Sequence, residues 1–158
     1  QPSDPSGLEV EVNVLRYRPV PEAVIRLGDG AVGDLLAVAA GALAAGTAPR
    51  VSSRVEVSKQ MREYLESRGA GVVVESDEEF HRYAKLHATT VDGLRVRLIQ
   101  GDARALAEAV GGSVDVAVYA EPVTGCGEVE LLPFLREQAV SATNHRFGNP
   151  TRLLDGVL

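Results

Sequence analysis

The first regular pattern in the chain is an alternation of apolar and polar residues over 8–14, Leu-Glu-Val-Glu-Val-Asn-Val. A period of two predicts a β-strand with one face in water. We therefore expect this segment to form an edge strand or a flap strand, because a strand buried on both faces is apolar along its whole length.

From Ala23 onward the pattern changes to short apolar runs separated by stretches of helical periodicity. Such runs are typical of parallel strands that are buried on both faces and joined by crossover helices. The predicted strands cover 23–27, 49–53, 71–75, 95–99 and 115–120, with Gln138 to Thr143 as a sixth. We expect an α/β fold, a Rossmann-like, doubly wound, mostly parallel sheet with the additional N-terminal edge or flap strand.

Helix starts and apolar faces can be located between these strands. In a capping box, with the spacing S-x-x-E, the side chain of each of the two residues accepts a hydrogen bond from the backbone amide of the other. This spacing occurs at Ser53 with Glu56 and at Ser76 with Glu79. Gly46 can end the first helix. The predicted apolar stripes are Val32, Leu35, Leu36, Ala39 and Leu43 in the first helix, Phe80, Tyr83, Ala84 and His87 in a later one, and Leu106, Ala107 and Val110 in the next.

Composition narrows the class of protein. A length of 158 residues fits one domain, which we place at 8–158 after a polar, linker-like lead at 1–7. One cysteine allows no internal disulfide, and 16 basic against 22 acidic residues argue against nucleic acid as a partner. No apolar run reaches the ~18 residues of a membrane-spanning helix, so we expect no such segment and a cytoplasmic location. Because Gln1 is not an initiator methionine, we expect a longer parent polypeptide.

One short motif has the spacing of a nucleotide-binding turn. Gly28, Gly30 and Gly33 match G-x-G-x-x-G between a predicted strand and a predicted helix, where glycines let a pyrophosphate approach the helix N-terminus. Asp29 would place negative charge beside that pyrophosphate, and the next strand ends at Arg54 without an acidic residue for a ribose hydroxyl. We therefore favour a turn used for packing, in which Gly33→Ala costs stability, and a solvated Arg54 rather than one that holds a 2′-phosphate.

The other candidate chemistry is sparse, and no catalytic or metal site is predicted. Only a helix N-terminus could lower the pKa of Cys126, which lies in a glycine-flanked loop. His81 and His87 are six residues apart on one predicted helix and so point to different faces, while His145 has no second metal ligand near it in the sequence. The acids that could gather at the carboxyl ends of strands are expected to be hydrated; they are Asp29, Asp115 and Glu121.

The end of the chain has the pattern of a docking tail. A turn broken by Pro133 leads into a β-prone run and then into amide, imidazole and guanidinium donors beside an aromatic residue. Donors in a row suit the carbonyls and carboxylates of a neighbouring surface, and the phenyl ring suits an apolar anchor point. The predicted docking residues are Asn144, His145, Arg146, Phe147, Gly148 and Asn149.

Several segments carry a resemblance to a known family. They are Asn13 to Pro19, Val24 to Leu27 with the alanine-rich Leu36 to Gly46, Val116 to Tyr119 and, most specifically, Leu131 to Asn149. Together they resemble the C-terminal region of long bacterial flavoenzymes of proline catabolism, which join proline dehydrogenase to an L-glutamate γ-semialdehyde (P5C) dehydrogenase.

The resemblance implies a function within a larger enzyme. In that family the terminal domain is similar to the nucleotide-binding half of aldehyde dehydrogenases, lacks the catalytic residues, packs on the catalytic module and helps to seal the cavity through which the semialdehyde passes. The nucleophile string F-x-x-x-G-Q-x-C and the base string E-L-G-G do not occur here. By resemblance, FAD and NAD belong to the parent enzyme, this domain holds no cofactor, and its partners are the remaining domains of the same polypeptide, with a homo-oligomer left open.

Two hypotheses from different classes follow. The first is a non-catalytic structural or lid domain of a proline-oxidising enzyme, favoured by the tail and by the missing nucleophile and base. The alternative is a stand-alone NAD(P)-binding module of an oxidoreductase, favoured by Gly28, Gly30 and Gly33.

Overall fold

The computed structural model describes residues 4–8, 11–89, 93–143, 145–146 and 149–150, the last two pairs by their backbone alone. The chain divides into two compact units. One comprises Pro19–Phe134, and the other combines Gln1–Arg18 with Leu135–Leu158. That 8–158 form one folding domain stays a prediction.

The unit Pro19–Phe134 is built on a five-stranded parallel sheet. Its order, β4-β3-β2-β5-β6, places two strands on one side of β2 before the chain returns to the other side, as in a doubly wound fold. The strands are β2 (Ala23–Leu27), β3 (Arg50–Ser53), β4 (Gly71–Val74), β5 (Leu94–Ile99) and β6 (Val116–Tyr119). The predicted Rossmann-like class is confirmed, and each predicted strand end lies within one residue of the observed end.

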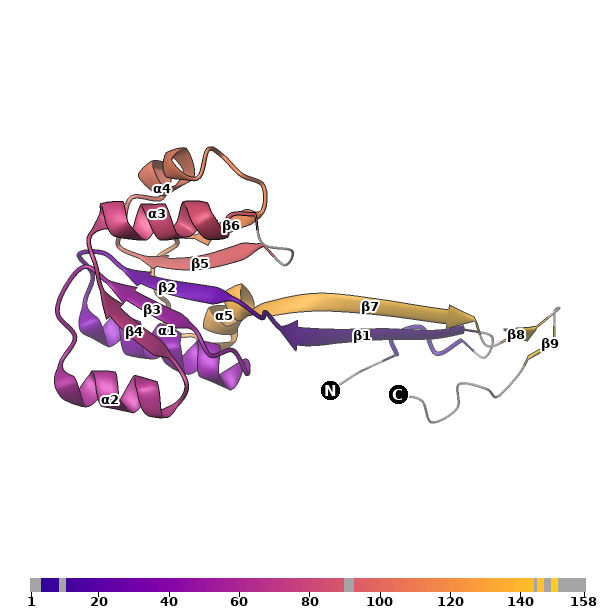
Figure 1. Ribbon diagram of the computed structural model, residues 1–158. Coiled ribbons are helices and arrows are strands. Elements are labelled where there is room, and N and C mark those ends of the chain that lie inside the picture. The colour runs from indigo at the N-terminus through magenta and orange to yellow at the C-terminus, as the bar shows by residue number, and fades with distance from the viewer. Residues whose placement is uncertain (1–3, 9–10, 90–92, 144, 147–148, 151–158) are drawn as a thin grey trace. The chain divides into compact units, whose positions relative to one another are not determined.

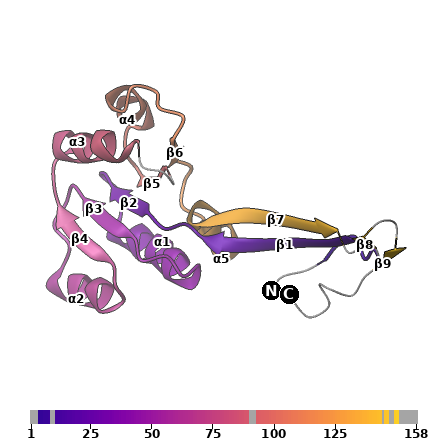
Figure 2. The same cartoon turned by 45° about the vertical axis from the view of Figure 1, so that its right-hand side comes forward.

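Helices cover both faces of this sheet (Figures 1 and 2). The first two pack on one face and the next two on the other, and a short helix with a 3-10 turn follows β6. The helices are α1 (Val32–Ala44), α2 (Lys59–Ser67), α3 (Asp77–His87), α4 (Ala103–Ala109), α5 (Gly127–Leu131) and the turn η1 (Leu132–Phe134). Within the described ranges, none of them combines the length and the apolar character needed to cross a bilayer.

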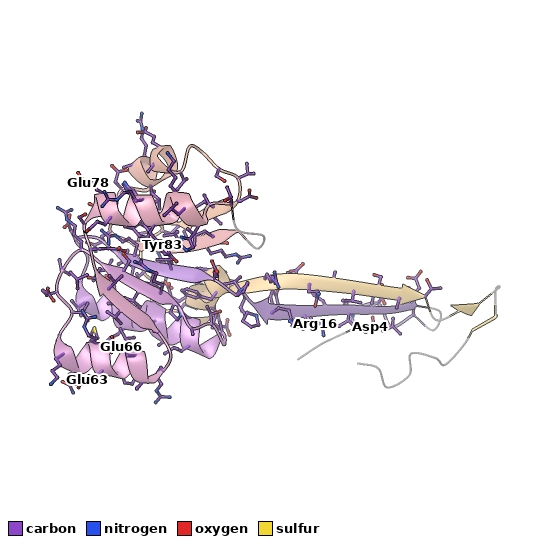
Figure 3. The ribbon with its side chains drawn as sticks, in the orientation of Figure 1. Asp4, Arg16, Glu63, Glu66, Glu78 and Tyr83 are labelled. Carbon is purple, nitrogen blue, oxygen red and sulfur yellow. The ribbon has the colours of Figure 1, made fainter. Side chains whose placement is uncertain are left out.

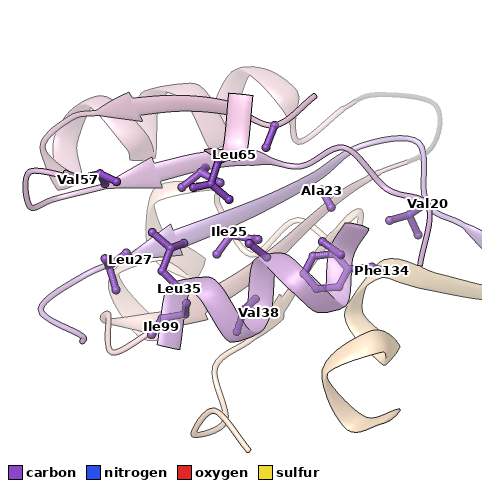
Figure 4. Packing of buried hydrophobic residues seen from close by; sticks show 14 residues of the cluster. Val20, Ala23, Ile25, Leu27, Leu35, Val38, Val57, Leu65, Ile99 and Phe134 are labelled. Carbon is purple, nitrogen blue, oxygen red and sulfur yellow. The ribbon is translucent and has the colours of Figure 1, made fainter. Parts of the chain in front are cut away.

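The core consists of two apolar layers, one on each face of the sheet. Because successive strand residues point to opposite faces, Ile25 of β2 packs with α1 and α2 while its neighbour Val24 packs with α3 and α4. Figure 4 shows the first layer, in which Phe134 closes one end and is fully buried. Val, Leu and Ala supply most of both layers.

The predicted capping box at α3 is confirmed. The Ser76 hydroxyl accepts the amide of Glu79 at 3.2 Å, and the Glu79 carboxylate accepts the amide of Ser76 at 2.8 Å. Each partner satisfies a backbone amide that the first helical turn leaves unpaired.

The capping box predicted at Ser53 and Glu56 is wrong. Ser53 is the last residue of β3, opposite Val74, and its buried hydroxyl donates to the carbonyl oxygen of Val55 at 2.6 Å. The parallel register therefore holds Ser53 in the sheet, and the helix begins later, with Ser58 as its N-cap.

The predicted apolar stripes are partly correct. Phe80, Ala84 and Leu106 are buried, whereas Leu36 is 39% exposed and Ala107 faces solvent. In α4 the buried face instead follows Ala103, Leu106 and Val110, which are three and four residues apart and so lie on one side of a helix.

The second unit contains a two-stranded ribbon, in which β1 (Glu11–Pro19) pairs with β7 (Leu135–Thr143) and runs in the opposite direction (Figure 1). A short pair follows, β8 (His145–Arg146) with β9 (Asn149–Pro150). The prediction of β7 as a sixth strand of the parallel sheet is wrong. Its polar residues, such as Arg136, Glu137 and Gln138, do not suit a strand that helices bury on both faces. The predicted N-terminal strand over 8–14 is observed from Glu11, and residues 9–10 lie outside the described part.

Phe134→Ala should lower the free energy of unfolding by about 3–5 kcal/mol, because it removes a fully buried ring from the first apolar layer. Leu86→Ala is the control, since Leu86 is 77% exposed and should change the value by less than about 0.5 kcal/mol. Urea denaturation measures both. Equal midpoints for the two variants would contradict the observed packing.

Candidate functional site

The carboxyl ends of the parallel strands are where a doubly wound fold binds ligands. At this edge Gly28 follows β2 directly, and its amide donates to the Ile99 carbonyl oxygen at 2.9 Å. The amide of the next residue, Asp29, donates to the Gln100 carbonyl oxygen at 3.2 Å. A Cβ atom on Gly28 would overlap the Gln100 carbonyl oxygen. Gly28 is therefore required by contact with the chain itself.

The other two glycines of the motif differ from each other. A Cβ atom at Gly30 would lie 3.0 Å from side-chain carbons of both Leu27 and Ile99, so Gly30 also serves packing. At Gly33 a Cβ atom would meet no atom within 4 Å. The expectation that Gly33 serves packing is wrong, because this position on α1 faces open space, and the structure gives no reason for Gly33→Ala to cost stability.

Charged side chains join the glycine turn to the neighbouring strand ends. Arg54, just beyond β3, lies 3.3 Å from the Asp29 carboxylate and 3.6 Å from the Asp77 carboxylate. All three side chains are at least half exposed, so each pair contributes little to stability. Their arrangement still matters for ligands, because the one cation at the tip of β3 is already shared between two carboxylates.

A hollow of about 280 Å³ lies at this edge, between α1, the end of β5 and the segment that follows β6. It is lined by Asp34 of α1, by Gln100 and by Glu121 after β6, among others. Gln100 has a φ of 49°, an uncommon backbone conformation for a residue with a side chain. The lining contains two carboxylates and no lysine or arginine, so it disfavours a pyrophosphate.

Buried in the sheet behind this edge, Arg26 is held by three separate segments. Its Nη1 atom donates to the Ser52 hydroxyl at 2.7 Å and to the Glu75 carbonyl at 3.1 Å, and its Nη2 donates to Asp77 Oδ1 at 2.7 Å. The guanidinium also lies 4.9 Å from the centre of the Phe80 ring. Only 1% of Arg26 is exposed, so these contacts compensate a charge that water does not reach.

A second arginine extends this network. Arg50 forms two hydrogen bonds to the Glu75 carboxylate, at 2.7 and 3.0 Å, and covers the ring of Tyr83 on α3 (Figure 3) at 4.0 Å. Burial alone would raise the pKa of Glu75, but hydrogen bonds from Arg50 and Ser52 outweigh it and hold that pKa below its usual range. The hydrogen bond from Arg26 is the main cause that lowers the pKa of Asp77.

On the other side of β2, a buried ion pair organises the segment after β6. Arg97 contacts the Glu130 carboxylate through Nε at 3.1 Å and Nη2 at 3.3 Å, and both side chains are 4% exposed. Arg97 Nη1 donates to the Glu121 carbonyl at 2.8 Å, and the Thr124 amide donates to Glu130 at 2.7 Å. The pair therefore fixes the loop that borders the hollow.

The remaining sequence candidates are not brought together. Cys126 is exposed and precedes α5, a helix of five residues, and its amide donates to the Thr124 hydroxyl at 3.2 Å. His87 stacks on Tyr83, and its Nδ1 lies 2.9 Å from the Tyr83 carbonyl. The acids Asp29, Asp115 and Glu121 are exposed, as expected. Among the described residues no three His, Cys, Asp or Glu side chains form a group that could hold a metal ion.

The predicted docking tail is only partly described. Asn144, Phe147 and Gly148 lie outside the described residues, and His145, Arg146 and Asn149 are described by their backbone alone, in β8 and β9. Their docking role stays a prediction.

Sequence reasoning did not find the buried charges Arg26, Arg97 and Glu130 or the half-buried Glu75. A signal was present, because an arginine within the apolar runs Val-Ile-Arg-Leu and Val-Arg-Leu-Ile must be paired if the strand is buried. The identity of the acidic partners depends on which strand ends lie side by side, and that follows only from the strand order.

Comparisons with known proteins give one match and two negative results. No protein-family model and no curated protein matches the chain. Among solved structures, one similar to it is Proline Utilization A (PutA) from Corynebacterium freiburgense, at 25% identity and a TM-score of 0.47. The match covers 94% of this chain and 12% of that protein. At this TM-score it establishes neither the fold nor an activity.

Gly28→Ala should lower the free energy of unfolding by about 1–3 kcal/mol, because the new methyl group meets backbone. Gly33→Ala should leave stability unchanged or raise it by up to about 1 kcal/mol, since alanine is the better helix former. Chemical denaturation of both variants provides the comparison. A larger loss in Gly33→Ala than in Gly28→Ala would refute the assigned contacts.

Glu75→Gln should remove stability that depends on pH. Because the folded-state pKa of Glu75 is lowered, its contribution is present above the unfolded pKa of about 4.3 and disappears as pH falls through the folded-state pKa. The variant should lose about 1–3 kcal/mol near neutral pH and match the parent chain in strong acid. The exposed pair member Glu63 supplies the control Glu63→Gln. A loss that is constant with pH would disprove the linkage.

Proposed function

We propose that this chain is a non-catalytic docking domain of a larger oxidoreductase that converts proline to glutamate through glutamate semialdehyde. In this proposal it supports the aldehyde dehydrogenase module and seals the cavity of the intermediate, while FAD and NAD bind elsewhere in the parent enzyme. The family comes from the sequence resemblance, most specifically over Leu131 to Asn149.

The ribbon is the observation that carries the docking part of the proposal. β7 has seven exposed residues out of nine, and in β1 only Val14 is buried. A two-stranded sheet without a covering layer is marginally stable in water. Exposed Tyr17 on β1 and Val140 on β7 supply apolar area, and Arg16 (Figure 3) bonds Gln138 across the strands at 2.7 Å. These features suit a ribbon that another part of the parent polypeptide covers.

The non-catalytic part of the proposal is supported by the carboxyl edge of the parallel sheet. The chain's own atoms occupy the space beside Gly28 and Gly30. The guanidinium of Arg54 is shared between the carboxylates of Asp29 and Asp77. The lining of the hollow at this edge includes the carboxylates of Asp34 and Glu121. A bound dinucleotide would have to displace these contacts and accept two nearby negative charges.

The alternative, a stand-alone NAD(P)-binding module, is favoured by one observation. The glycine turn lies between the central strand and α1 of a sheet with Rossmann-like order, which is where such folds bind a pyrophosphate. Its charges oppose that function, so we place it second.

Deletion of 144–158 should separate docking from folding. The shortened chain should keep its fold, because the core lies in Pro19–Phe134. In the full-length enzyme the same deletion should impair aldehyde oxidation and lengthen the lag before NADH appears from proline, with proline dehydrogenation largely spared. Stopped-flow absorbance follows the NADH.

Arg104→Ala is the matched control, since that side chain is 89% exposed on α4 and should not alter the lag. If the shortened full-length enzyme couples the two reactions as well as the intact enzyme, the docking proposal is wrong.

A further inference from the structure

Two residues of the unit Pro19–Phe134 connect it to the ribbon. β1 continues directly into Val20, and Phe134 directly precedes β7. The Val20 amide donates to the Phe134 carbonyl oxygen at 2.9 Å, so the two chain segments are paired at this place. Both residues are buried in the first apolar layer (Figure 4). We refer to this pair of residues as the ribbon base.

One hydroxyl group bridges the ribbon base. Thr47 Oγ1 lies 3.2 Å from the Val20 carbonyl oxygen and 3.2 Å from the Phe134 carbonyl oxygen. Because a hydroxyl group carries one proton and a carbonyl group carries none, Thr47 is the donor and shares its proton between the two acceptors. Thr47 is buried, so this bridge does not compete with bulk water.

The end of α1 sets the position of that hydroxyl group. The Gly46 amide donates to the Leu43 carbonyl at 3.1 Å and the Thr47 amide to the Ala42 carbonyl at 2.9 Å, which is the Schellman pattern of a helix C-terminus. The pattern requires a left-handed residue just before Thr47, and Gly46 supplies it with a φ of 84°. Backbone hydrogen bonds therefore fix Thr47 relative to α1.

The Phe134 side of the ribbon base is held by α5. This helix approaches α1 so closely that a Cβ atom at Gly41 would lie 2.9 Å from the Glu130 carbonyl oxygen. The Glu130 carboxylate is paired with Arg97 of β5, and η1, which ends at Phe134, follows α5 directly. The carbonyl group that accepts from Thr47 is thus positioned by contacts within Pro19–Phe134.

The ribbon needs a fixed base because its own residues specify its pairing weakly. Strands that are polar on both faces can slip in register, since no buried face distinguishes one alignment from the next. β7 is exposed at seven of nine positions, and β1 has one buried residue, Val14. The alignment of the two strands therefore depends on the contacts at the ribbon base.

We propose that Thr47 is a positioning residue of the docking ribbon. Its hydroxyl group holds the two chain segments side by side at the ribbon base and so sets the alignment from which β1 and β7 extend. The effect on docking rests on the function proposed above. The structural effect does not, because Thr47, Val20 and Phe134 all belong to the unit Pro19–Phe134.

Two substitutions separate the hydroxyl group from the rest of the side chain. Thr47→Val keeps the shape and removes the hydroxyl, whereas Thr47→Ser keeps the hydroxyl and removes the methyl group. In the 158-residue chain, the Val20 amide should exchange with solvent about fivefold or more faster in Thr47→Val, because a hydrogen bond of the base is lost. Thr47→Ser should exchange at Val20 as the parent chain does. Hydrogen exchange followed by NMR resolves the individual amides.

The Ile25 amide, in the central strand β2, is the internal reference, because it reports opening of the whole sheet. Thr47→Val should accelerate exchange at Val20 more than at Ile25. Thr89→Val, at an exposed threonine in the turn after α3, is the matched control and should change neither rate. The inference is overturned if Val20 exchange is unchanged in Thr47→Val, if Ile25 accelerates by the same factor, or if Thr47→Ser exchanges as fast as Thr47→Val.

The full-length parent enzyme tests the effect on docking. There Thr47→Val should lengthen the lag before NADH appears from proline, and Thr47→Ser should not. If the exchange rates change as expected and the lag stays normal, Thr47 still positions the ribbon but the docking function is wrong.

Discussion

The guanidinium of Arg26 sits in the central strand, where 1% of it is exposed, and the rest of the carboxyl edge is arranged around it. A buried charge is tolerated only when it is paired and hydrogen bonded. Its acceptors come from Ser52 at the end of β3, from Glu75 beyond β4, and from Asp77 at the start of α3. Pairing one arginine therefore fixes the relative positions of two neighbouring strands and one helix.

This constraint has a consequence for function. The edge of a doubly wound sheet binds ligands because backbone amides and helix N-termini there are left without partners. In this chain Arg54 pairs with both Asp29 and Asp77, and Arg50 pairs with Glu75. The sheet keeps the architecture of a nucleotide-binding fold, while the electrostatics of its edge favour contacts within the chain.

The fold could be predicted from the sequence to a large extent, because buried parallel strands are apolar runs and the crossovers between them have helical periodicity. The predictions from the sequence were wrong where the structure depends on pairing between strands that are far apart in the chain. β7 is regular and β-prone, yet it pairs with β1 and not with the parallel sheet. Ser53 has the spacing of a capping box, but its strand register holds it in β3.

The candidate site was less predictable than the fold. The glycine motif identified the correct turn, but its three glycines proved to have different surroundings, with Gly33 in open space and Gly28 against a carbonyl oxygen. Arg26 could be recognised as an unusual residue in an apolar strand, whereas Glu75 and Asp77 become its partners only through the order of the strands.

The most direct measurement of the central claim, that the chain's own charges close this edge to nucleotides, is a thermal melt of the chain with increasing NAD up to millimolar concentration. Ligand that binds only the native state raises the melting temperature by mass action. We predict no rise. A dose-dependent rise that Gly30→Val abolishes would contradict the claim and favour a dinucleotide-binding module.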